Sequence, residues 1–414
     1  MAYTAMTDGF FPLLADFAAR SGTIGRASLD DVRRVLGKER LSEEDFALLL
    51  SPAAGEELET LARRAEKETL RHFGRAKQLF APLYLANYCT NTCVYCGFHA
   101  GQGIARKALE PADIEKEAGA LAATGLRRVL ALTGDAPKRT GADYIAGAVE
   151  ILARHFPSVG IEVQALTGEE YAKVAQAGAD SMTMFQETYN PELYARLHLS
   201  GPKRDFAFRL DAPHRAAGAG MRGVTLGALL GLGDWRFDIF MLGMHAAWIQ
   251  RKFPHLELAF SLPRMRPCSE EEHSPGKTRS AGEAEFSPVP VSDREFVQAM
   301  TALRCFLPHA GITLSTRESA FLRDKLLPLG VTKLSAGVCT AVGGYADKEP
   351  EDVQFVIDDQ RSVPEVVAAL EYLGYQPVFA DWLLPKDGNL PLAGALCDSL
   401  GNPGASAPGV GVTP

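Results

Sequence analysis

One stretch of the sequence indicates both the fold and the chemistry of this chain: Leu79-Phe-Ala-Pro-Leu-Tyr-Leu85-Ala-Asn-Tyr-Cys89-Thr-Asn-Thr-Cys93-Val-Tyr-Cys96. Its first part, Leu79 to Leu85, is an uninterrupted apolar run of the length that a buried parallel strand requires. Its second part carries three cysteines within eight residues, with the spacing Cys-x₃-Cys-x₂-Cys. This order predicts a β-strand that ends in a loop of metal-binding thiols.

The cysteine spacing favours an iron–sulfur cluster with one open iron. A cubane [4Fe–4S] cluster is normally held by four thiolates, so three would leave one iron available to a reactant. We therefore assign Cys89, Cys93 and Cys96 as cluster ligands. Two alternatives stay open at this point. The three cysteines could form a Cys₃His zinc site with His99, or Cys93 and Cys96 alone could be a redox pair.

The composition is that of an ordinary globular protein and excludes several functional classes. The net charge of −8 argues against a protein that binds nucleic acid mainly by electrostatics. No apolar run approaches the roughly 20 residues of a membrane span, and residues 1–9 lack the features of a secretory signal. Seven cysteines, three of them clustered, do not resemble a secreted disulfide framework. We therefore expect a cytoplasmic protein.

Apolar runs alternate with amphipathic helical patterns along most of the chain. The expected strands are 77–85, 129–133, 161–165, 181–186, 223–227, 256–262, 312–316 and 331–336. The expected helices between them are 111–123, 143–155, 169–177, 191–198, 235–252, 293–307 and 321–327. Eight such units predict an α/β fold, a (β/α)₈ barrel of TIM type.

The expected barrel occupies residues 76–384, and three other segments precede, interrupt or follow it. Residues 1–75 are rich in helix formers and predict a helical N-terminal extension, with a capping box beginning at Ser42. Residues 269–292 form a charged insertion with Pro, Ser and Gly, which we expect to be a mobile loop. Residues 385–414 are rich in Gly and Pro and predict a flexible tail.

Polar clusters follow four of the expected strands. The cysteine loop follows the first strand, and the other clusters are Thr133-Gly134-Asp135, Gln186-Glu-Thr-Tyr189 and Ser315-Thr-Arg-Glu318. Right-handed βα connections place all strand carboxyl ends on one rim of the barrel. The sequence therefore predicts that the four clusters converge on a single site.

The motifs resemble those of a known family. The cysteine loop with its aromatic residue Tyr95, and a Gly-containing acidic turn after the next strand, resemble radical S-adenosylmethionine (SAM) enzymes. Six longer motifs look like the aromatic amino-acid lyase branch, and most like 2-iminoacetate synthases, the tyrosine lyases of thiamine biosynthesis. They are Pro82-Leu-Tyr-Leu-Ala-Asn-Tyr-Cys89, Phe185-Gln-Glu-Thr-Tyr189, Arg209-Leu-Asp-Ala-Pro213, Pro263-Arg-Met-Arg-Pro267, Ser315-Thr-Arg-Glu318 and Gly343-Gly-Tyr-Ala-Asp347.

The resemblance implies a carbon–carbon lyase with a [4Fe–4S] cluster and SAM as cofactors. L-Tyrosine would be cleaved between Cα and Cβ to p-cresol and dehydroglycine (2-iminoacetate), and SAM to methionine and 5′-deoxyadenosine. The implied partners are a thiazole synthase and a flavodoxin or ferredoxin electron donor. The alternatives are a radical SAM lyase of tryptophan or another aromatic amino acid, and a hydrogenase-maturation-like tyrosine lyase that lacks the second cluster. The hydrogenase-maturing tyrosine lyases are less similar, because residues 385–414 hold only Cys397 where those enzymes bind a second cluster.

The resemblance also implies roles for individual residues at the cofactor. Gly134 and Asp135 would meet the SAM amino group, although relatives usually carry Glu where this chain has Asp. Arg209 would bind the SAM carboxylate, and Glu187 would form hydrogen bonds with the ribose hydroxyls. The remaining implied cofactor residues are Val224 and Gly227 at the adenine and Tyr95 in the pocket lining, where Tyr95 could instead only pack beneath the cluster.

The substrate would be bound by the motif after the seventh strand. Arg317 would hold the amino-acid carboxylate through its planar guanidinium, with Ser315 and Thr316 as additional hydroxyl donors. The alternative for Arg317 is a structural salt bridge to Glu318 or Asp324. The residues that recognise the phenol are not marked by any spacing.

Overall fold

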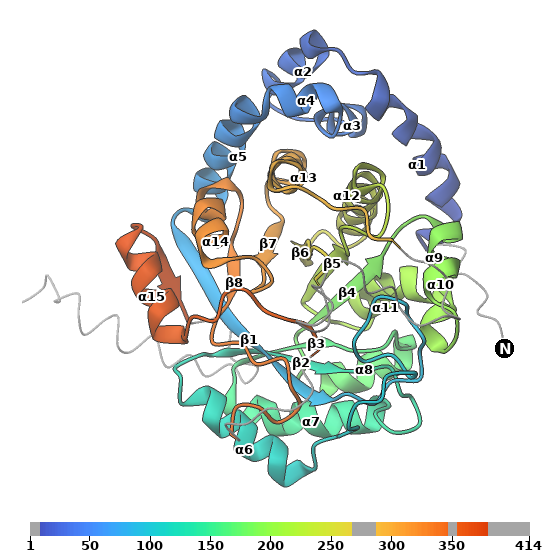
Figure 1. Cartoon of the computed structure of the whole chain (residues 1–414), viewed down its shortest axis with the longest axis vertical. Coiled ribbons are helices and arrows are strands. Elements are labelled where there is room, and N and C mark those ends of the chain that lie inside the picture. Colours follow the sequence, from blue (N-terminus) through green and yellow to red (C-terminus); the bar gives the residue numbers. More distant parts are fainter. Residues whose placement is uncertain (1–8, 267–286, 347–353, 380–414) are drawn as a thin grey trace, which may run out of the picture. The chain divides into compact units, whose positions relative to one another are not determined.

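The strands close into a parallel barrel. The computed structural model describes residues 9–266, 287–346 and 354–379. Within this part, β1 pairs in parallel with both β2 and β8 and so joins the two ends of the strand order. The predicted (β/α)₈ architecture is therefore confirmed (Figure 1). The eight barrel strands are β1 (Ala76–Ala86), β2 (Arg128–Thr133), β3 (Ser158–Glu162), β4 (Ser181–Glu187), β5 (Gly223–Ala228), β6 (Glu257–Ser261), β7 (Gly311–Leu314) and β8 (Lys333–Ser335).

The helices expected between the strands are all present, with ends that agree to within one residue. They are α6 (Pro111–Ala122), α7 (Ala142–His155), α8 (Gly168–Gln176), α9 (Pro191–Leu197), α12 (Trp235–Lys252), α13 (Asp293–Phe306) and α14 (Ala320–Leu326). The remaining helical elements of this region are η3 (Pro202–Arg204), α10 (Phe206–Leu210), α11 (Ala212–Gly218), η5 (Leu327–Leu329) and α15 (Val363–Tyr372).

The N-terminal region is helical, as predicted, and covers α12 and α13 on the side away from the strands (Figure 1). Its elements are η1 (Phe11–Leu13), α1 (Leu14–Arg20), η2 (Ser21–Arg26), α2 (Leu29–Leu36), α3 (Glu43–Leu49), α4 (Pro52–Glu56) and α5 (Leu58–Phe73). The capping box at the start of α3 is formed, because Ser42 Oγ accepts a hydrogen bond from the Asp45 amide. Phe46 then stacks on Phe306 of α13, with ring centroids 4.4 Å apart.

Side chains alternate along the strands between the barrel interior and the surrounding helices, as the period of two requires. On β4, Ser181, Thr183 and Phe185 line an interior cavity, whereas Met182 and Met184 pack in the hydrophobic core. The same alternation on the other strands brings polar and aromatic side chains together inside the barrel. The strand register therefore decides which residues can reach a ligand.

Two features of the strands differ from the prediction. The expected third strand, 161–165, is instead Ser158–Glu162, so Glu162 is the last residue of the strand. An additional short strand that we did not predict, β9 (Gln376–Val378), pairs in parallel with the start of β1. Both β3 and β9 are short. The position of such a strand depends more on the strand with which it pairs than on its own apolar pattern.

The expected segment boundaries are only partly covered by the described residues. The boundary after residue 75 falls between α5 and β1. Of the expected insertion 269–292, only residues 287–292 are described, and they carry neither helix nor strand. The proposed end of the barrel at residue 384 and the tail 385–414 lie outside the described residues.

Candidate active site

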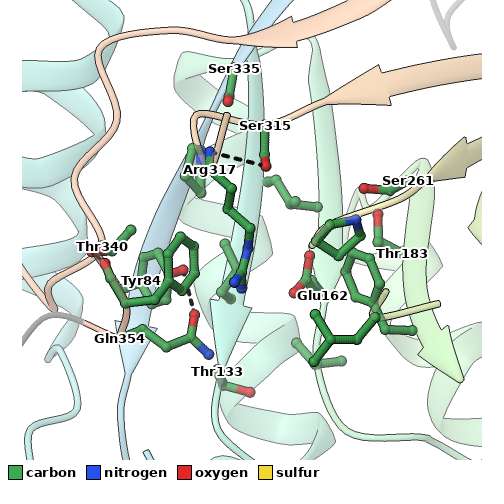
Figure 2. A pocket seen from close by; sticks show the side chains of 18 of the residues that line it. Tyr84, Thr133, Glu162, Thr183, Ser261, Ser315, Arg317, Ser335, Thr340 and Gln354 are labelled. Carbon is green, nitrogen blue, oxygen red and sulfur yellow. Dashed lines mark hydrogen bonds between the residues drawn. The ribbon is translucent and has the colours of Figure 1, made fainter. Parts of the chain in front are cut away.

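A cavity of about 260 Å³ lies inside the barrel. Its walls include side chains from all eight barrel strands or from the loops that follow them (Figure 2). The four polar clusters predicted at strand ends all contribute to it. The lining residues include at least one from each cluster, namely Cys89, Asp135, Glu187 and Arg317. The predicted convergence of the clusters is therefore observed.

The cysteine loop is held in place by backbone hydrogen bonds to the segment after α9. The Val94 amide donates to the Leu197 carbonyl at 3.1 Å, and the Thr92 amide donates to the Ser200 carbonyl at 3.3 Å. Arg106 donates to the carbonyls of Phe98 and His99 from the other side. These bonds hold the loop that carries the three thiols.

The donor set fits a [4Fe–4S] cluster with one open iron. Five cysteines are described, all of them free thiols, and only Cys89, Cys93 and Cys96 line the cavity. Burial raises the pKa of each of these three thiols, so cluster binding must displace their protons. Among the described residues, no three His, Cys, Asp or Glu side chains converge closely enough for a single metal ion.

Gly134 and Asp135 lie directly beneath the cysteine loop. A Cβ atom at Gly134 would stand 2.4 Å from the Tyr88 carbonyl oxygen, so only glycine permits this close approach. The Asp135 carbonyl accepts the Thr90 amide at 2.8 Å, and Asp135 Oδ2 accepts Asn91 Nδ2 at 2.8 Å. One carboxylate oxygen of Asp135 thus stabilises the loop, while the residue still faces the cavity.

Glu187 lies at the centre of a buried charged network and has a strained backbone. Its φ of 71° is the one positive value among the described non-glycine residues, and it follows a register shift between β4 and β5. Lys203 Nζ donates to Glu187 Oε1 at 2.6 Å, and Arg209 Nη2 lies 3.8 Å from the same oxygen. Burial alone would lower the pKa of Lys203, but Glu187 and Cys93 outweigh it and raise the pKa. Lys203 therefore stays charged beside the cluster site.

Arg209 is buried and oriented by the same strand end. Its Nε donates to the Phe185 carbonyl at 2.8 Å, which fixes the guanidinium against β4. No partner for its Nη1 occurs among the described residues, so this nitrogen of the guanidinium is available to a ligand in the cavity. This position is compatible with the predicted contact to the SAM carboxylate.

Tyr95 both lines the cavity and packs beneath the loop. His198 Nδ1 donates to the Tyr194 carbonyl at 2.7 Å, so its Nε2 accepts the Tyr95 hydroxyl, also at 2.7 Å. Burial lowers the pKa of His198 to about 2, which keeps the imidazole neutral and this arrangement fixed. Tyr95 therefore lies on the cavity wall with its hydroxyl held by His198.

Val224 and Gly227 are not among the residues that line the cavity. Val224 points outward into the hydrophobic core, and the alternation of β5 places Thr225 inside instead. At Gly227 an added Cβ would stand 2.3 Å from the Phe185 ring. Glycine there makes room for Phe185, which itself lines the cavity.

Arg317 is free to bind a substrate carboxylate. Its guanidinium stacks on the Phe355 ring, 3.5 Å from the centroid, and has no ion pair among the described residues. The alternative salt bridges are absent because their carboxylates are used elsewhere. Glu318 pairs with Arg264 and Arg266, and Asp324 pairs with Arg361. The structural role considered for Arg317 is therefore wrong.

Ser315 and Thr316 occupy the same turn. Ser315 Oγ accepts the Arg317 amide at 3.4 Å, and both residues line the cavity (Figure 2). The Thr316 carbonyl accepts the amides of Asp358 and Asp359 at 3.0 and 3.2 Å. The turn that carries Arg317 is thus joined to the segment that carries Phe355.

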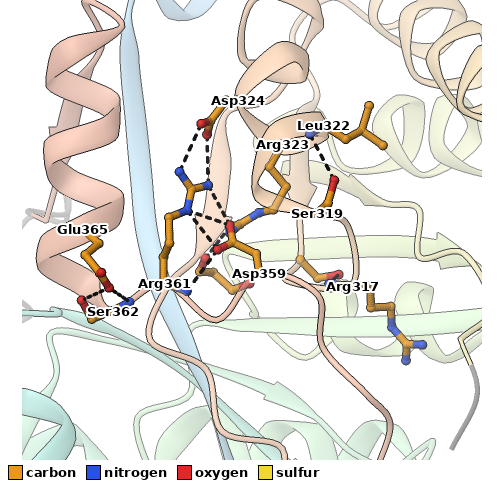
Figure 3. Close-up of polar contacts among 11 residues, drawn as sticks. Arg317, Ser319, Leu322, Arg323, Asp324, Asp359, Arg361, Ser362 and Glu365 are labelled. Carbon is orange, nitrogen blue, oxygen red and sulfur yellow. Dashed lines mark hydrogen bonds and ion pairs between the residues drawn. The ribbon is translucent and has the colours of Figure 1, made fainter. Parts of the chain in front are cut away.

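A buried ion-pair cluster anchors this second segment (Figure 3). Arg323, fully buried on α14, binds Asp359 and the Ser335 carbonyl, and Arg361 Nη2 donates to Asp359 at 2.7 Å. Burial alone would raise the pKa of Asp359, but the two arginines outweigh it and lower the pKa. The cluster thereby fixes the chain close to Phe355 and holds its ring against Arg317.

The substitution Asp359→Asn is expected to destabilise the protein by about 2–3 kcal/mol, because it leaves the buried Arg323 without its charged partner. Urea unfolding followed by circular dichroism measures this change. Asp324→Asn is the matched control, since Asp324 pairs with Arg361 near the surface and should cost less than about 1 kcal/mol. Equal losses in the two variants would contradict the assigned difference.

Several cavity residues were not predicted from the sequence. Glu162 was missed because the third strand was placed three residues too late, although Ser158, Gly160 and Glu162 show the alternation of an inward face. Lys203 had no recognisable motif. Tyr84 donates to Gln354 Oε1 at 2.7 Å across the cavity wall, a contact between residues 270 positions apart. Ser335 Oγ, also not predicted, lines the cavity and is buried without a partner among the described residues.

Comparison with known proteins agrees with this site. Residues 83–238 match the radical SAM superfamily, and residues 261–376 match the biotin and thiamin synthesis associated domain. The chain is 40% identical to the 2-iminoacetate synthase of Escherichia coli (strain K12), over 85% of this chain and 90% of that protein. The same enzyme of Salmonella typhimurium is 39% identical, over 85% of this chain and 90% of that protein. The X-ray structure of the FeFe-hydrogenase maturase HydG from Carboxydothermus hydrogenoformans superposes with a TM-score of 0.80 at 30% identity, covering 92% of this chain and 86% of that one.

A closed βα barrel with three cavity cysteines, matched to this superfamily, defines a radical SAM enzyme. Its cofactors are accordingly a [4Fe–4S] cluster and SAM. Within the superfamily, the chain belongs to the 2-iminoacetate synthase family. Among the described helices, none has the length and apolarity needed to cross a membrane.

Proposed function

We propose that the protein cleaves the Cα–Cβ bond of L-tyrosine to p-cresol and 2-iminoacetate, and that the 2-iminoacetate supplies the thiazole moiety of thiamine. The observation that carries this proposal is the 40% identity to 2-iminoacetate synthase over 85% of the chain. The cavity supports it, because Arg317, which has no ion pair among the described residues, lies within the same barrel as the cysteine loop and suits an amino-acid carboxylate.

The cofactors supply the radical chemistry and the protein supplies position and shielding. When bound, the cluster and SAM would supply radical chemistry directed at the amino group of the substrate. Cys89, Cys93 and Cys96 would hold the cluster. The proposed contacts to SAM are Asp135 at its amino group, Arg209 at its carboxylate, Glu187 at its ribose, and Gly134 and Tyr95 around the nucleoside.

Arg317 is proposed to orient the substrate by its carboxylate. Its guanidinium lies over the Phe355 ring, 3.5 Å from the centroid, and both residues line the cavity, where the guanidinium can bind a carboxylate through two hydrogen bonds. The hydroxyls of Ser315 and Thr316 lie beside it on the same turn. A single orientation of the amino acid brings its Cα–Cβ bond to one place, which fragmentation of that bond requires.

The wall that carries Phe355 also limits the access of water. Gln354 and Phe355 line the cavity, and the hydrogen bond from Tyr84 to Gln354 ties this wall to β1. Exclusion of water protects a reactive intermediate from side reactions. The same reasoning applies to the product, because dehydroglycine hydrolyses readily.

We further propose that the product passes directly to a thiazole synthase partner, and that a flavodoxin or ferredoxin supplies the electron. The instability of dehydroglycine in water supports the first partner, and the need to reduce the cluster supports the second. A reducing cytoplasm suits both the cluster and the free thiols of the described chain.

The test is a product assay on the full-length protein, reconstituted with iron and sulfide without oxygen and then reduced. L-Tyrosine or L-tryptophan is added separately with SAM. We expect p-cresol and 5′-deoxyadenosine in equal amounts from tyrosine. An indole product from tryptophan, together with no p-cresol from tyrosine, would contradict the proposed substrate and favour the tryptophan lyase alternative.

A further inference from the structure

Two charged side chains face each other across the cavity without forming an ion pair. Arg317 follows β7 and Glu162 ends β3, and Figure 2 shows their head groups pointing toward one another. Among the described residues, neither the Glu162 carboxylate nor the Arg317 guanidinium has an ion-pair partner. Charged groups inside a protein are normally paired, because burial without a partner is costly. Two opposite and unpaired charges in one cavity therefore indicate a ligand that carries both complementary charges.

An α-amino acid has this charge pattern. Its carboxylate matches Arg317, and its ammonium group matches a carboxylate a short distance away. Glu162 is the only acidic residue on the cavity walls, within the described chain, that neither pairs with a cation nor supports the cysteine loop. Asp135 accepts from Asn91, and Glu187 accepts from Lys203.

The position of Glu162 also suits the reacting nitrogen. The charges that act on its carboxylate come from Glu187, Arg317, Arg209 and Lys203, so it lies between the substrate arginine and the network beside the cysteine loop. The substrate amino group must lie there too, with its carboxylate on Arg317 and its N–H directed at the cofactor. Burial and the nearby Glu187 raise the pKa of Glu162 to about 7, which suits a group that accepts a proton near neutral pH.

We propose that Glu162 binds the substrate amino group opposite Arg317 and takes one proton from its ammonium form. In this step an N–H bond breaks heterolytically, the proton moves to a Glu162 carboxylate oxygen, and the electron pair stays on nitrogen. No oxidant or reductant is needed. The resulting neutral amine can lose a hydrogen atom without leaving a positive charge on nitrogen. This role rests on the proposed amino-acid lyase function and names the residue that selects the amino end of the substrate.

The test compares two ligands on the cluster-loaded, SAM-bound protein. They are L-tyrosine and 3-(4-hydroxyphenyl)propionate, which keeps the carboxylate and the phenol but lacks the amino group. Their dissociation constants are measured at equilibrium above pH 8, where the Glu162 carboxylate is ionised. In Glu162→Gln, we expect affinity for tyrosine to fall by about 10- to 100-fold and affinity for the deamino analogue to change by less than about threefold.

Controls separate this role from general disruption of the site. Glu150→Gln makes the same change on the exposed face of α7 and should leave both affinities unchanged. Glu162→Asp should recover part of the preference for tyrosine. Equal losses for both ligands in Glu162→Gln, or unchanged tyrosine affinity, would overturn the proposal. If the variants do not fold, a wild-type protein that fails to prefer tyrosine over the analogue overturns it as well.

Failure of the proposed function gives a different result. Suppose that the wild-type protein prefers tyrosine over its deamino analogue, that this preference depends on Glu162, and that no p-cresol forms. The proposed amino-group site would then be supported and the proposed lyase reaction contradicted. The binding ratio therefore tests Glu162 alone, while product analysis tests the lyase assignment.

Discussion

In Cys93→Ala, cluster binding and SAM cleavage are expected to fall to background. The side chain is buried at the cavity wall between Cys89 and Cys96, and its removal leaves two thiolates where the cluster needs three. No other described cysteine lines the cavity and could take its place. Iron and sulfide per chain after anaerobic reconstitution, and the 5′-deoxyadenosine released from SAM, measure the effect.

The matched control is Cys305→Ala on α13. Cys305 is equally buried, but it lies in the hydrophobic core among apolar side chains. We expect this variant to keep the wild-type iron content and SAM cleavage and to lose about 1 kcal/mol of stability through the small cavity created. If Cys93→Ala kept a full cluster, or if both variants lost it equally, the ligand assignment would be wrong.

Arg317→Met is expected to lower tyrosine cleavage by about a thousandfold, measured as kcat/KM for p-cresol. Methionine fills much of the same space on Phe355 but leaves the substrate carboxylate buried without a cation, which typically costs 3–5 kcal/mol. The kcat/KM of Arg317→Lys should lie between those of the wild type and Arg317→Met. Lysine keeps the positive charge but cannot form the paired hydrogen bonds of a guanidinium. Cluster content should be unchanged in both variants.

Arg196→Met serves as the control, since Arg196 is exposed on α9 and outside the cavity. Its activity should match that of the wild type within about twofold. Activity of Arg317→Met near the wild-type level would show that the carboxylate is bound elsewhere. A loss of cluster in that variant would instead indicate a structural role for Arg317.

Much of the site could be predicted because it depends on local sequence. The cysteine loop, the turn at Gly134 and the motif around Arg317 each directly follow a strand, and the barrel topology alone brings strand ends together. The helices expected between the strands were placed to within one residue at each end. Short strands gave less information, and the shift of β3 concealed Glu162.

Other features depended on partners far away in the sequence. Whether Arg317 is free follows from Glu318 binding Arg264 and Arg266, and from Asp324 binding Arg361. A neighbour in sequence is an equally plausible partner until the turn geometry is known. The outward orientation of Val224 likewise follows from the register of β5, since a shift by one residue would exchange it with Thr225.

By itself, the sequence indicated the strand-and-helix alternation of the barrel through its periodicity, and the candidate thiol ligands through the spacing of three cysteines. The class of chemistry followed from motifs that resemble those of a known family. Only the tertiary structure decided which charges remain unpaired. Pairing of buried charges depends on distances between elements that the chain brings together from remote positions, as with Glu162 and Arg317. The two unsatisfied charges that define the inferred amino-acid site therefore became visible only in the folded barrel.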